Sequence, residues 1–524
     1  MISLERHVIP RTSVAGFGAT IETWTAEEKA IFLNDDLTLE QLDKQCVLKQ
    51  AHVNLSQREL LYQSLSRSYA SLPPTEAVTK NLSLLRKENT MTLTTGHQLS
   101  LGLGPLFLLY KALHVINLCE AYNQRNQPFT LVPVFWLASE DHDFEEIKST
   151  HVFNKTFTWE TDQSGAVGRF RTDGLTAIYE EIKALFPQDL SLEELLSVQE
   201  DTYGQHYRAL LHRVFGTYGL VIIDGDEPSL KRSFLPWMKQ ELESSFVADA
   251  VTHTNTMLQS FGKPIQAHAR PINLFYLSHG KRTRIIPTPE AFTVDGTILS
   301  KEALFSVMDD HPERFSPNVL FRPFYQESIL PNVGYVGGSG ELTYWAQLKG
   351  LFQKTGMVFP LLKTRVSAFI SKNHIPSENI HTYFLPFNQQ IDALLGKESD
   401  RDAVFTRLEQ PLEALLSAMT EGISTLGDES KKWSAAQAAA ITSSIEQYKH
   451  RWQKEQKQQL DTKIKRLERI HQAFYPQGIP QERHTHLLHF CGTHSLNEWI
   501  EVLKNGLDPF CSDIHIFVQN HEAA

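Results

Sequence analysis

The sequence predicts an α/β protein built on a doubly wound parallel sheet. Short runs of apolar residues recur before residue 370, and most are followed by glycine or acidic residues and then by a helical pattern. Strands that are apolar along their whole length are typical of a parallel sheet covered by helices on both faces. The predicted strands are residues 90–95, 129–137, 219–223, 332–336 and 357–362.

Helical patterns and insertions surround these strands. Residues 37–88 carry apolar side chains every three or four positions, so we expect residues 1–88 to form a helical segment that packs on a core over 89–370. Long insertions interrupt the core at about 148–218 and 225–315. They contain predicted antiparallel strand pairs at 148–160 and at 272–288, the latter turning at Ser278-His279-Gly280.

The chain changes character over residues 371–480. Apolar residues at helical spacing over 405–423 and 429–475 predict two helices, joined by a turn at Gly427 with Asp428 as the expected N-cap. We interpret them as an antiparallel coiled-coil hairpin, whose polar stretch weakens the apolar seam so that a second copy is needed to cover it. Residues 481–524 predict a helix and then a strand that return to the core.

Composition narrows the class of function. The 524 residues exceed a single core, and the formal net charge of −11 argues against a broad grip on nucleic acid or an anionic membrane. The first residues show no signal-peptide pattern, and no apolar run approaches the roughly 18 residues that span a bilayer. The four cysteines lie far apart without C-x-x-C spacing, which fits a reducing compartment. We expect a cytoplasmic protein without nucleic-acid or membrane partners.

The first candidate site is the turn "TTGHQLSLGLGP", which joins the first predicted strand to a helix. In an open parallel sheet, ligands bind beyond the carboxyl ends of the strands, and helix N-termini attract phosphate. His97 is a candidate catalytic residue that donates to a phosphate oxygen, and the nucleotide-binding candidates are Gly96, Gln98 and Gly104. The alternative is a tight corner whose glycines only permit packing, since neither Walker A nor G-x-G-x-x-G spacing is present.

The second predicted strand ends in an acidic cluster, "SEDHDFEE". Carboxylates at this density bind a substrate amine or a Mg²⁺ ion, or act as a general base. The candidate catalytic residues are Glu140, Asp141 and Asp143, and His142 is a substrate-binding candidate. A solvated acidic loop is the alternative.

A third candidate is "GYVGGSGELTYW", where glycines follow a strand and an acidic residue opens a helix. Arg322 and Gln326 precede that strand and are expected to reach the same crevice. The substrate-binding candidates are therefore Arg322, Gln326, Gly337, Gly338, Gly340, Glu341 and Tyr344. Spacing alone fits a glycine-rich corner equally well.

Two further segments are rich in basic residues or histidines. Lys363, Arg365 and Ser367 follow the last predicted strand and are candidate ligands of triphosphate oxygens, although two basic residues in five are common by chance. The late stretch "HTHLLHFCGTH" lacks a second cysteine and regular finger spacing, and residues 486–490 alternate as a strand does. No metal site is expected there.

Four segments together carry a resemblance to a known family. "TTGHQLSLGLGPLFLLYKA", "PVFWLASEDHDFEEI", "SPNVLFRPFYQESILPNVGYVGGSGELTYWAQLKG" and "FPLLKTRVSAFI" resemble the cysteine ligase family of bacillithiol biosynthesis (BshC). The resemblance extends over most of the chain, including the coiled coil and "PQER" at 480–483. It implies a Rossmann-like core with two connecting-peptide insertions, and a coiled coil that makes a homodimer.

The resemblance also implies a reaction, the joining of cysteine through its carboxyl group to the amine of glucosaminyl malate. The family core is similar to class I aminoacyl-tRNA synthetases. By that analogy, Gly96-His97-Gln98 with Gly104 stands where their histidine signature grips ATP, and residues 363–367 stand where their lysine loop lies. We therefore expect an ATP-dependent ligase that passes through a cysteinyl adenylate, with ATP as co-substrate and Mg²⁺ as a candidate ion.

Two other functions compete with the ligase. The glycine turns and acidic cluster could serve a non-catalytic scaffold that binds a nucleotide or sugar and recruits partners through its coiled coil. An aminoacyl-tRNA synthetase proper is disfavoured, because the acidic charge balance leaves no basic face for tRNA.

Overall fold

A computed structural model describes residues 2–18, 20–186, 192, 195–278, 280–372, 375, 380–396, 401–492 and 494–519. Its contacts divide the chain into two units. The first comprises residues 1–12, 17–374 and 481–524, and the second comprises 13–16 and 375–480.

The first unit is built on a parallel sheet, which confirms the predicted fold class. Its strands are β2 (Thr90–His97), β3 (Thr130–Leu137), β6 (Val221–Asp224), β13 (Asn332–Gly337) and β14 (Leu361–Thr364). They lie in the order β14-β13-β2-β3-β6, and every neighbouring pair is parallel. The last strand begins at Leu361 rather than at 357, next to Pro360, which has no N–H to give to a ladder.

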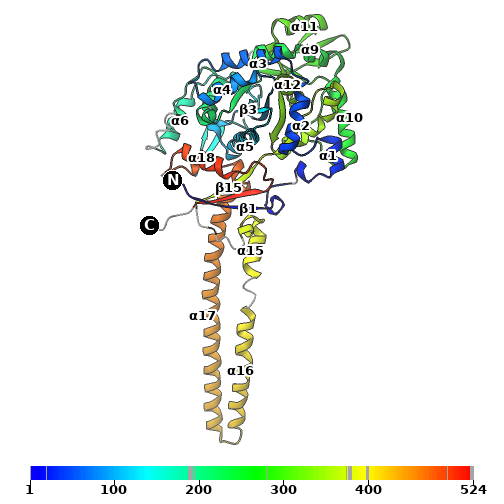
Figure 1. The fold of residues 1–524 in the computed structure, drawn as a ribbon. Coiled ribbons are helices and arrows are strands. Elements are labelled where there is room, and N and C mark those ends of the chain that lie inside the picture. The colour runs from blue at the N-terminus through cyan, green and yellow to red at the C-terminus, as the bar shows by residue number, and fades with distance from the viewer. Residues whose placement is uncertain are drawn as a thin grey trace. The chain divides into compact units, whose positions relative to one another are not determined.

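Each face of this sheet is buried under helices, as the apolar strands predict. In β3, Leu131 and Phe135 join one hydrophobic cluster while Val132 and Val134 join the other, because successive side chains point to opposite faces. One cluster includes α5 (Leu106–Asn123), α8 (Tyr203–Phe215) and α18 (Leu496–Gly506). The other includes α3 (Leu55–Ser68), α4 (Glu76–Leu85), α9 (Pro228–Ser244), α10 (Phe246–Ser260), α12 (Arg322–Ile329), α13 (Ser339–Gln347) and α14 (Lys349–Thr355). Figure 1 shows α3, α4 and α5 around β3.

The insertions carry small sheets of their own. The pairs β4 (Ser149–Val152) with β5 (Lys155–Thr158) and β7 (Leu274–Ser278) with β8 (Lys281–Arg284) are antiparallel, which confirms both predicted pairs. His279, in the predicted second turn, lies outside the described residues. Among the described residues, the remaining α-helices and strands of this unit's insertions and N-terminal region are α1 (Ala26–Phe32), α2 (Leu39–Gln50), α6 (Leu175–Lys183), α11 (Lys301–Asp310), β9 (Ile286–Pro287), β10 (Ala291–Val294), β11 (Thr297–Ser300) and β12 (Phe315–Pro317).

The structure corrects three of the sequence predictions, two of them through a second, mixed sheet. β16 (Ile514–Gln519) pairs with β1 (Leu4–Ile9) and β15 (Ser367–Ser371), so the N-terminal segment begins with a strand, not only helices. Ser367 opens β15 rather than lying in a loop. Residues 487–489 form a 3₁₀ turn instead of the strand that their alternation suggested, because the His486 ring accepts from the Leu488 N–H and caps the turn.

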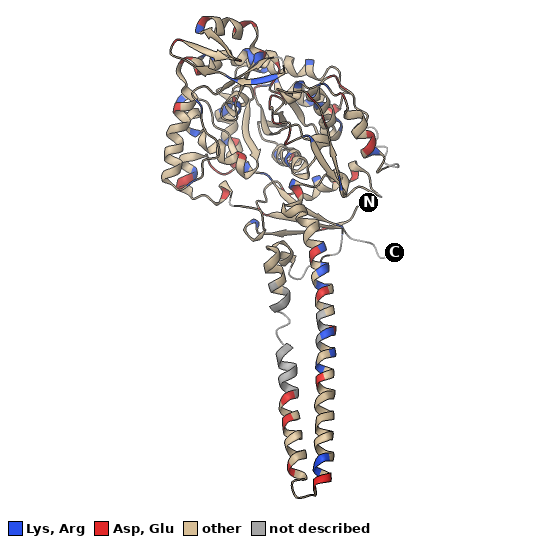
Figure 2. Ribbon diagram, turned by 180° about the vertical axis from the view of Figure 1, so that it is seen from behind, with Lys and Arg blue, Asp and Glu red and all other residues tan. Residues whose placement is uncertain are grey.

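The second unit contains α15 (Phe387–Gly396), α16 (Arg401–Gly422) and α17 (Asp428–Phe474). The pair α16 and α17 forms the predicted antiparallel hairpin (Figure 1), with Gly427 rather than Asp428 at the N-cap position. The side chains of Phe405 and Leu408, at the start of the helix predicted over 405–423, lie outside the described residues. Basic and acidic residues follow one another along α17 (Figure 2), as a solvated helix face requires. None of the described helices is both long and apolar enough to cross a membrane.

Candidate active site

A pocket of about 230 Å³ lies at the carboxyl ends of β2, β3 and β13. The chain proceeds from β2 toward β3 on one side and later adds β13 on the other, so the pocket occupies the topological switch point where open α/β sheets bind ligands. Its lining residues are Gly96, His97, Gln98, Trp136, Ala138, Asp141, Val319, Arg322, Pro323, Gln326, Tyr335, Glu341, Tyr344 and Trp345.

The pocket gathers predicted residues from three segments that are far apart in the sequence. The end of β2 contributes Gly96 and His97, the turn after it contributes Gln98, and the acidic cluster contributes Asp141. The segment around β13 contributes Arg322, Gln326, Glu341 and Tyr344. The other predicted site residues do not line it: Gly104, Glu140, His142, Asp143, Gly337, Gly338, Gly340, Lys363, Arg365 and Ser367.

The end of β2 places His97 at the pocket. A Cβ on Gly96 would lie 2.8 Å from the Trp136 carbonyl oxygen, so only glycine lets β2 approach β3 this closely. The His97 ring packs edge-on against Phe107, and its Nδ1 lies 3.0 Å from the Gln98 carbonyl oxygen. That bond assigns the ring proton to Nδ1 and leaves Nε2 as an acceptor. Burial, with Lys111 nearby, lowers the pKa of His97 to about 4, so the ring is neutral at pH 7.

Asp141 supplies a fixed negative charge. Gln98 Nε2 donates to Asp141 Oδ2 over 3.2 Å, and the His142 backbone N–H donates to Asp141 Oδ1 over 2.8 Å. An Arg322 guanidinium nitrogen lies 3.9 Å from Oδ2. Although burial alone would raise the pKa of Asp141, the hydrogen bonds and the nearby arginines lower it well below its usual range. The carboxylate is therefore ionised at neutral pH and a poor proton acceptor.

A buried lysine beneath the pocket was missed by the sequence reasoning. Lys111 on α5 is 1% exposed, and its ammonium donates to the Gly96 carbonyl oxygen over 2.8 Å and to Glu341. Glu341 in turn accepts from the Gly338 N–H over 3.2 Å and from the Tyr335 hydroxyl over 3.4 Å. Lys111 thereby links the end of β2 to α13. A single lysine inside the apolar run "LFLLYKALHVINL" was the available signal, because lysine is almost never fully buried unless paired.

The rest of the acidic cluster lies outside the pocket. Glu140 is 4% exposed and forms an ion pair of 2.6 Å with Lys231, which also pairs with Asp226 over 2.7 Å. His142 is half exposed and packs against Phe275. Asp143 is exposed.

Gly102 and Gly104, later in the first turn, lie in close contact with neighbouring segments. A Cβ on Gly104 would lie 2.6 Å from His486 and 2.7 Å from Thr150, and His486 Nε2 lies 2.7 Å from the Gly102 carbonyl oxygen. The N–H of Leu106, the first residue of α5, donates to the Thr485 carbonyl oxygen over 2.9 Å. The start of α5 is thus covered by the late histidine-rich segment.

The basic run begins inside β14, which contains Lys363, and its side chains are engaged in contacts of their own. Lys363 donates to Ser512 over 3.0 Å. Arg365 forms a bidentate ion pair with Glu482, which is fully buried, and also donates to the Ser367 hydroxyl over 3.0 Å. The Arg365 guanidinium also lies over the Phe107 ring, 5.1 Å from its centroid. The same Phe107 ring packs against His97.

Within the described part of the chain, no group of three or more His, Cys, Asp or Glu side chains is placed to hold a metal ion. In the late histidine segment, His484 stacks on His151 with ring centroids 4.1 Å apart, and His486 is buried. These contacts give both rings a packing role.

Comparisons with known proteins agree with this architecture. Residues 19–366 match the model of the N-terminal Rossmann-like domain of bacillithiol biosynthesis BshC, and residues 359–518 match that of its C-terminal coiled-coil domain. A protein from Flavobacterium johnsoniae is 33% identical over 467 residues, covering 86% of this chain and 88% of its own. One from Cytophaga hutchinsonii is 35% identical over 467 residues, covering 88% of each chain. Both carry the name "Putative cysteine ligase BshC".

Proposed function

We propose, from the premise that this chain belongs to the BshC family of bacillithiol biosynthesis, that it is the ligase that joins cysteine to the amine of glucosaminyl malate. The observation that carries the proposal is the pairing of Asp141 and Arg322 in one pocket at the switch point of the sheet. An amino acid carries an ammonium and a carboxylate a few ångströms apart. In this pocket Asp141 is complementary to the ammonium and Arg322 to the carboxylate.

Cysteine is the substrate that fits the pocket. At about 230 Å³ the cavity is smaller than the roughly 300–1,000 Å³ that sites for drug-sized ligands occupy, so it accommodates an amino acid better than a whole nucleotide. The ionised Asp141 receives the cysteine ammonium, and Arg322 receives its carboxylate. ATP and the sugar then approach from the pocket mouth.

The reaction we propose has two steps. A carboxylate oxygen of cysteine attacks the α-phosphorus of ATP, so that cysteinyl adenylate forms and pyrophosphate leaves, with Mg²⁺ brought in on the phosphates. The amine of glucosaminyl malate then attacks the acyl carbon, AMP leaves, and the nitrogen loses a proton. His97 Nε2 is the assigned acceptor of that proton, because it carries a free lone pair and its pKa of about 4, although itself lowered by burial, stays above the more strongly depressed pKa of Asp141.

Isotope exchange tests the adenylate separately from the ligation. With ATP, cysteine and Mg²⁺ but no sugar, labelled pyrophosphate should enter ATP, and omission of cysteine should stop the exchange. The complete reaction should release AMP and consume glucosaminyl malate. Release of ADP with the amide still formed would overturn the adenylate and leave the ligase. No amide from purified protein and all substrates would overturn the ligase.

We further propose a cytoplasmic homodimer formed through the hairpin of α16 and α17. Leu415, Trp433 and Tyr448 in this hairpin are each about half exposed or more, so a second copy that covered them would bury apolar surface. Light scattering should give twice the 59.7 kDa chain mass, and Trp433→Lys should shift it toward the monomer. An unchanged dimer after deletion of both helices would place the interface elsewhere.

A further inference from the structure

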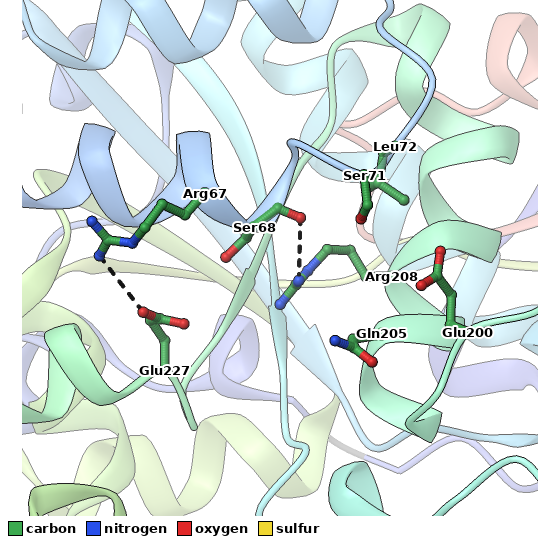
Figure 3. A pocket seen from close by; sticks show the side chains of 8 residues that line it. All are labelled: Arg67, Ser68, Ser71, Leu72, Glu200, Gln205, Arg208 and Glu227. Atoms are coloured by element: carbon green, nitrogen blue, oxygen red, sulfur yellow. Dashed lines mark hydrogen bonds and ion pairs between the residues drawn. The ribbon is translucent and has the colours of Figure 1, made fainter.

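We infer that the first unit contains a second small-molecule site, which takes a zwitterion of the amino-acid class. The site is a pocket of about 330 Å³ between α3, α8 and the turn before α9 (Figure 3). Its lining residues are Arg67, Ser68, Ser71, Leu72, Glu200, Gln205, Arg208 and Glu227. It shares no lining residue with the candidate active site.

Arg208 is the observation that points to a ligand. It is 9% exposed, yet its Nε has no hydrogen-bond partner among the described residues. Its other contacts are long, 3.4 Å to the Ser68 carbonyl oxygen and 3.7 Å to Asp224. A buried guanidinium with unused donors is costly, and a carboxylate is the planar group that matches its geometry.

Two glutamates that line the pocket, Glu200 and Glu227, supply the charge that is complementary to Arg208. Arg67 lies at the rim and its nearest nitrogen is 3.7 Å from Glu227, beyond hydrogen-bond distance. Figure 3 shows Glu200 and Glu227 on opposite sides of Arg208. With Asp224 behind Arg208, the carboxylates outnumber the guanidinium groups, so a bare multivalent anion would be repelled. A ligand that places a carboxylate against Arg208 and an ammonium against Glu227 or Glu200 pairs each of its charges with an opposite charge of the pocket.

Calorimetric titration with L-serine and its two half-ligands tests the inference. Glycolate keeps the anion and hydroxyl, and ethanolamine keeps the ammonium and hydroxyl. All proteins carry Asp141→Asn, which removes the carboxylate assigned to the cysteine amine, so failure of the proposed ligase does not affect the result. We expect L-serine to bind and each half-ligand to bind at least about tenfold more weakly, because each lacks one charge-assisted contact.

Added substitutions locate the binding. Arg208→Gln and the double variant Glu200→Gln/Glu227→Gln should each weaken L-serine binding, by about tenfold or more for Arg208→Gln, because they remove the groups assigned to the ligand carboxylate and ammonium. Glu59→Gln is the matched control, because Glu59, like Glu227, is partly exposed and faces one arginine, Arg86. The partly exposed position of Glu227 and Glu200 keeps the test valid if Arg208→Gln impairs folding. No L-serine binding, equal binding of glycolate, or undiminished binding in the double variant would overturn the inference.

Discussion

The Lys111 ammonium and the Glu341 carboxylate form an ion pair at the candidate active site, although 230 residues separate them in the sequence. Burial lowers the pKa of Lys111, and Glu341 opposes that effect. Burial alone would raise the pKa of Glu341, but Lys111 and the other neighbours bring it below its ordinary value. Each group therefore favours the charged form of the other, and the pair fixes the two segments that form the pocket.

Lys111→Met should impair both activity and stability. The change keeps the length of the side chain but leaves the largely buried Glu341 without its cation, and such losses cost about 3–5 kcal/mol when the remaining charge is fully buried. We expect a smaller cost here because Glu341 is 26% exposed, together with a loss of about 10²-fold in kcat/KM. Urea unfolding and steady-state kinetics measure the two effects.

Lys504→Met is the control for this prediction. Lys504 on α18 pairs with Glu120, which lies on α5 farther along the helix than Lys111, and Glu120 is 43% exposed. We expect a cost under about 1 kcal/mol and unchanged kinetics. An equal loss of activity in both variants would mean that α5 responds as a whole and that Lys111 has no special role.

His97 should titrate far below its ordinary pKa and leave a signature in stability. Burial lowers its folded pKa to about 4, against about 6.5 in the unfolded chain. The unfolded chain therefore binds the extra proton first, so His97 destabilises the fold progressively as pH falls from about 6.5 to 4. His97→Gln should lessen the loss of unfolding free energy over that interval. Carbon-13 imidazole shifts should place the titration near 4, and a value near 6.5 would contradict the prediction.

Asp141 should also make the fold less stable as pH falls, but over a more acidic range. Its folded pKa is depressed, so its stabilisation is fully present above the unfolded value of about 3.9 and is lost as pH falls toward the folded pKa. The difference in unfolding free energy between wild type and Asp141→Asn should stay constant from pH 7 to 5 and shrink below about pH 4. The variant should also raise the KM for cysteine more than that for ATP. A KM effect confined to ATP would place the amino acid elsewhere.

The parallel sheet could be predicted because each core strand is buried on both faces and therefore consists mostly of apolar and uncharged residues. β1 and β15 were not predicted, because their partner β16 lies at the far end of the chain, where no local pattern shows the pairing. The pocket residues Gln98, Asp141 and Glu341 could be predicted because each closely follows the carboxyl end of a core strand.

The orientation of charged side chains could not be predicted in the same way. Glu140 and Asp141 are neighbours in the acidic cluster, yet one pairs with Lys231 beneath the loop and the other faces the pocket. Arg365 depends on Glu482, a partner 117 residues away whose position only the folded chain supplies. A local pattern predicts which loops meet at a site, whereas distant partners decide which charges remain available for a ligand.

The pair of Arg365 and Glu482 allows a test between a structural and a nucleotide-binding role. Both side chains are buried, so Glu482→Gln or Arg365→Met alone leaves one charge without its partner and should cost about 3–5 kcal/mol in unfolding free energy. The double variant Arg365→Met/Glu482→Met removes both charges and should recover much of that loss, because buried pairs often exchange for apolar residues at little cost.

Kinetics of the same variants completes the test. If Arg365 serves only to anchor the turn after β14, the stable double variant keeps its KM for ATP within about threefold of wild type. Lys363→Met is the companion variant, because Lys363 lies two residues earlier and contacts Ser512 instead of a carboxylate. If Arg365 releases Glu482 to bind the triphosphate, the double variant shows a KM for ATP raised tenfold or more despite its restored stability. That second outcome would support the nucleotide-binding role that the sequence predicts for Arg365 from its position after the last core strand.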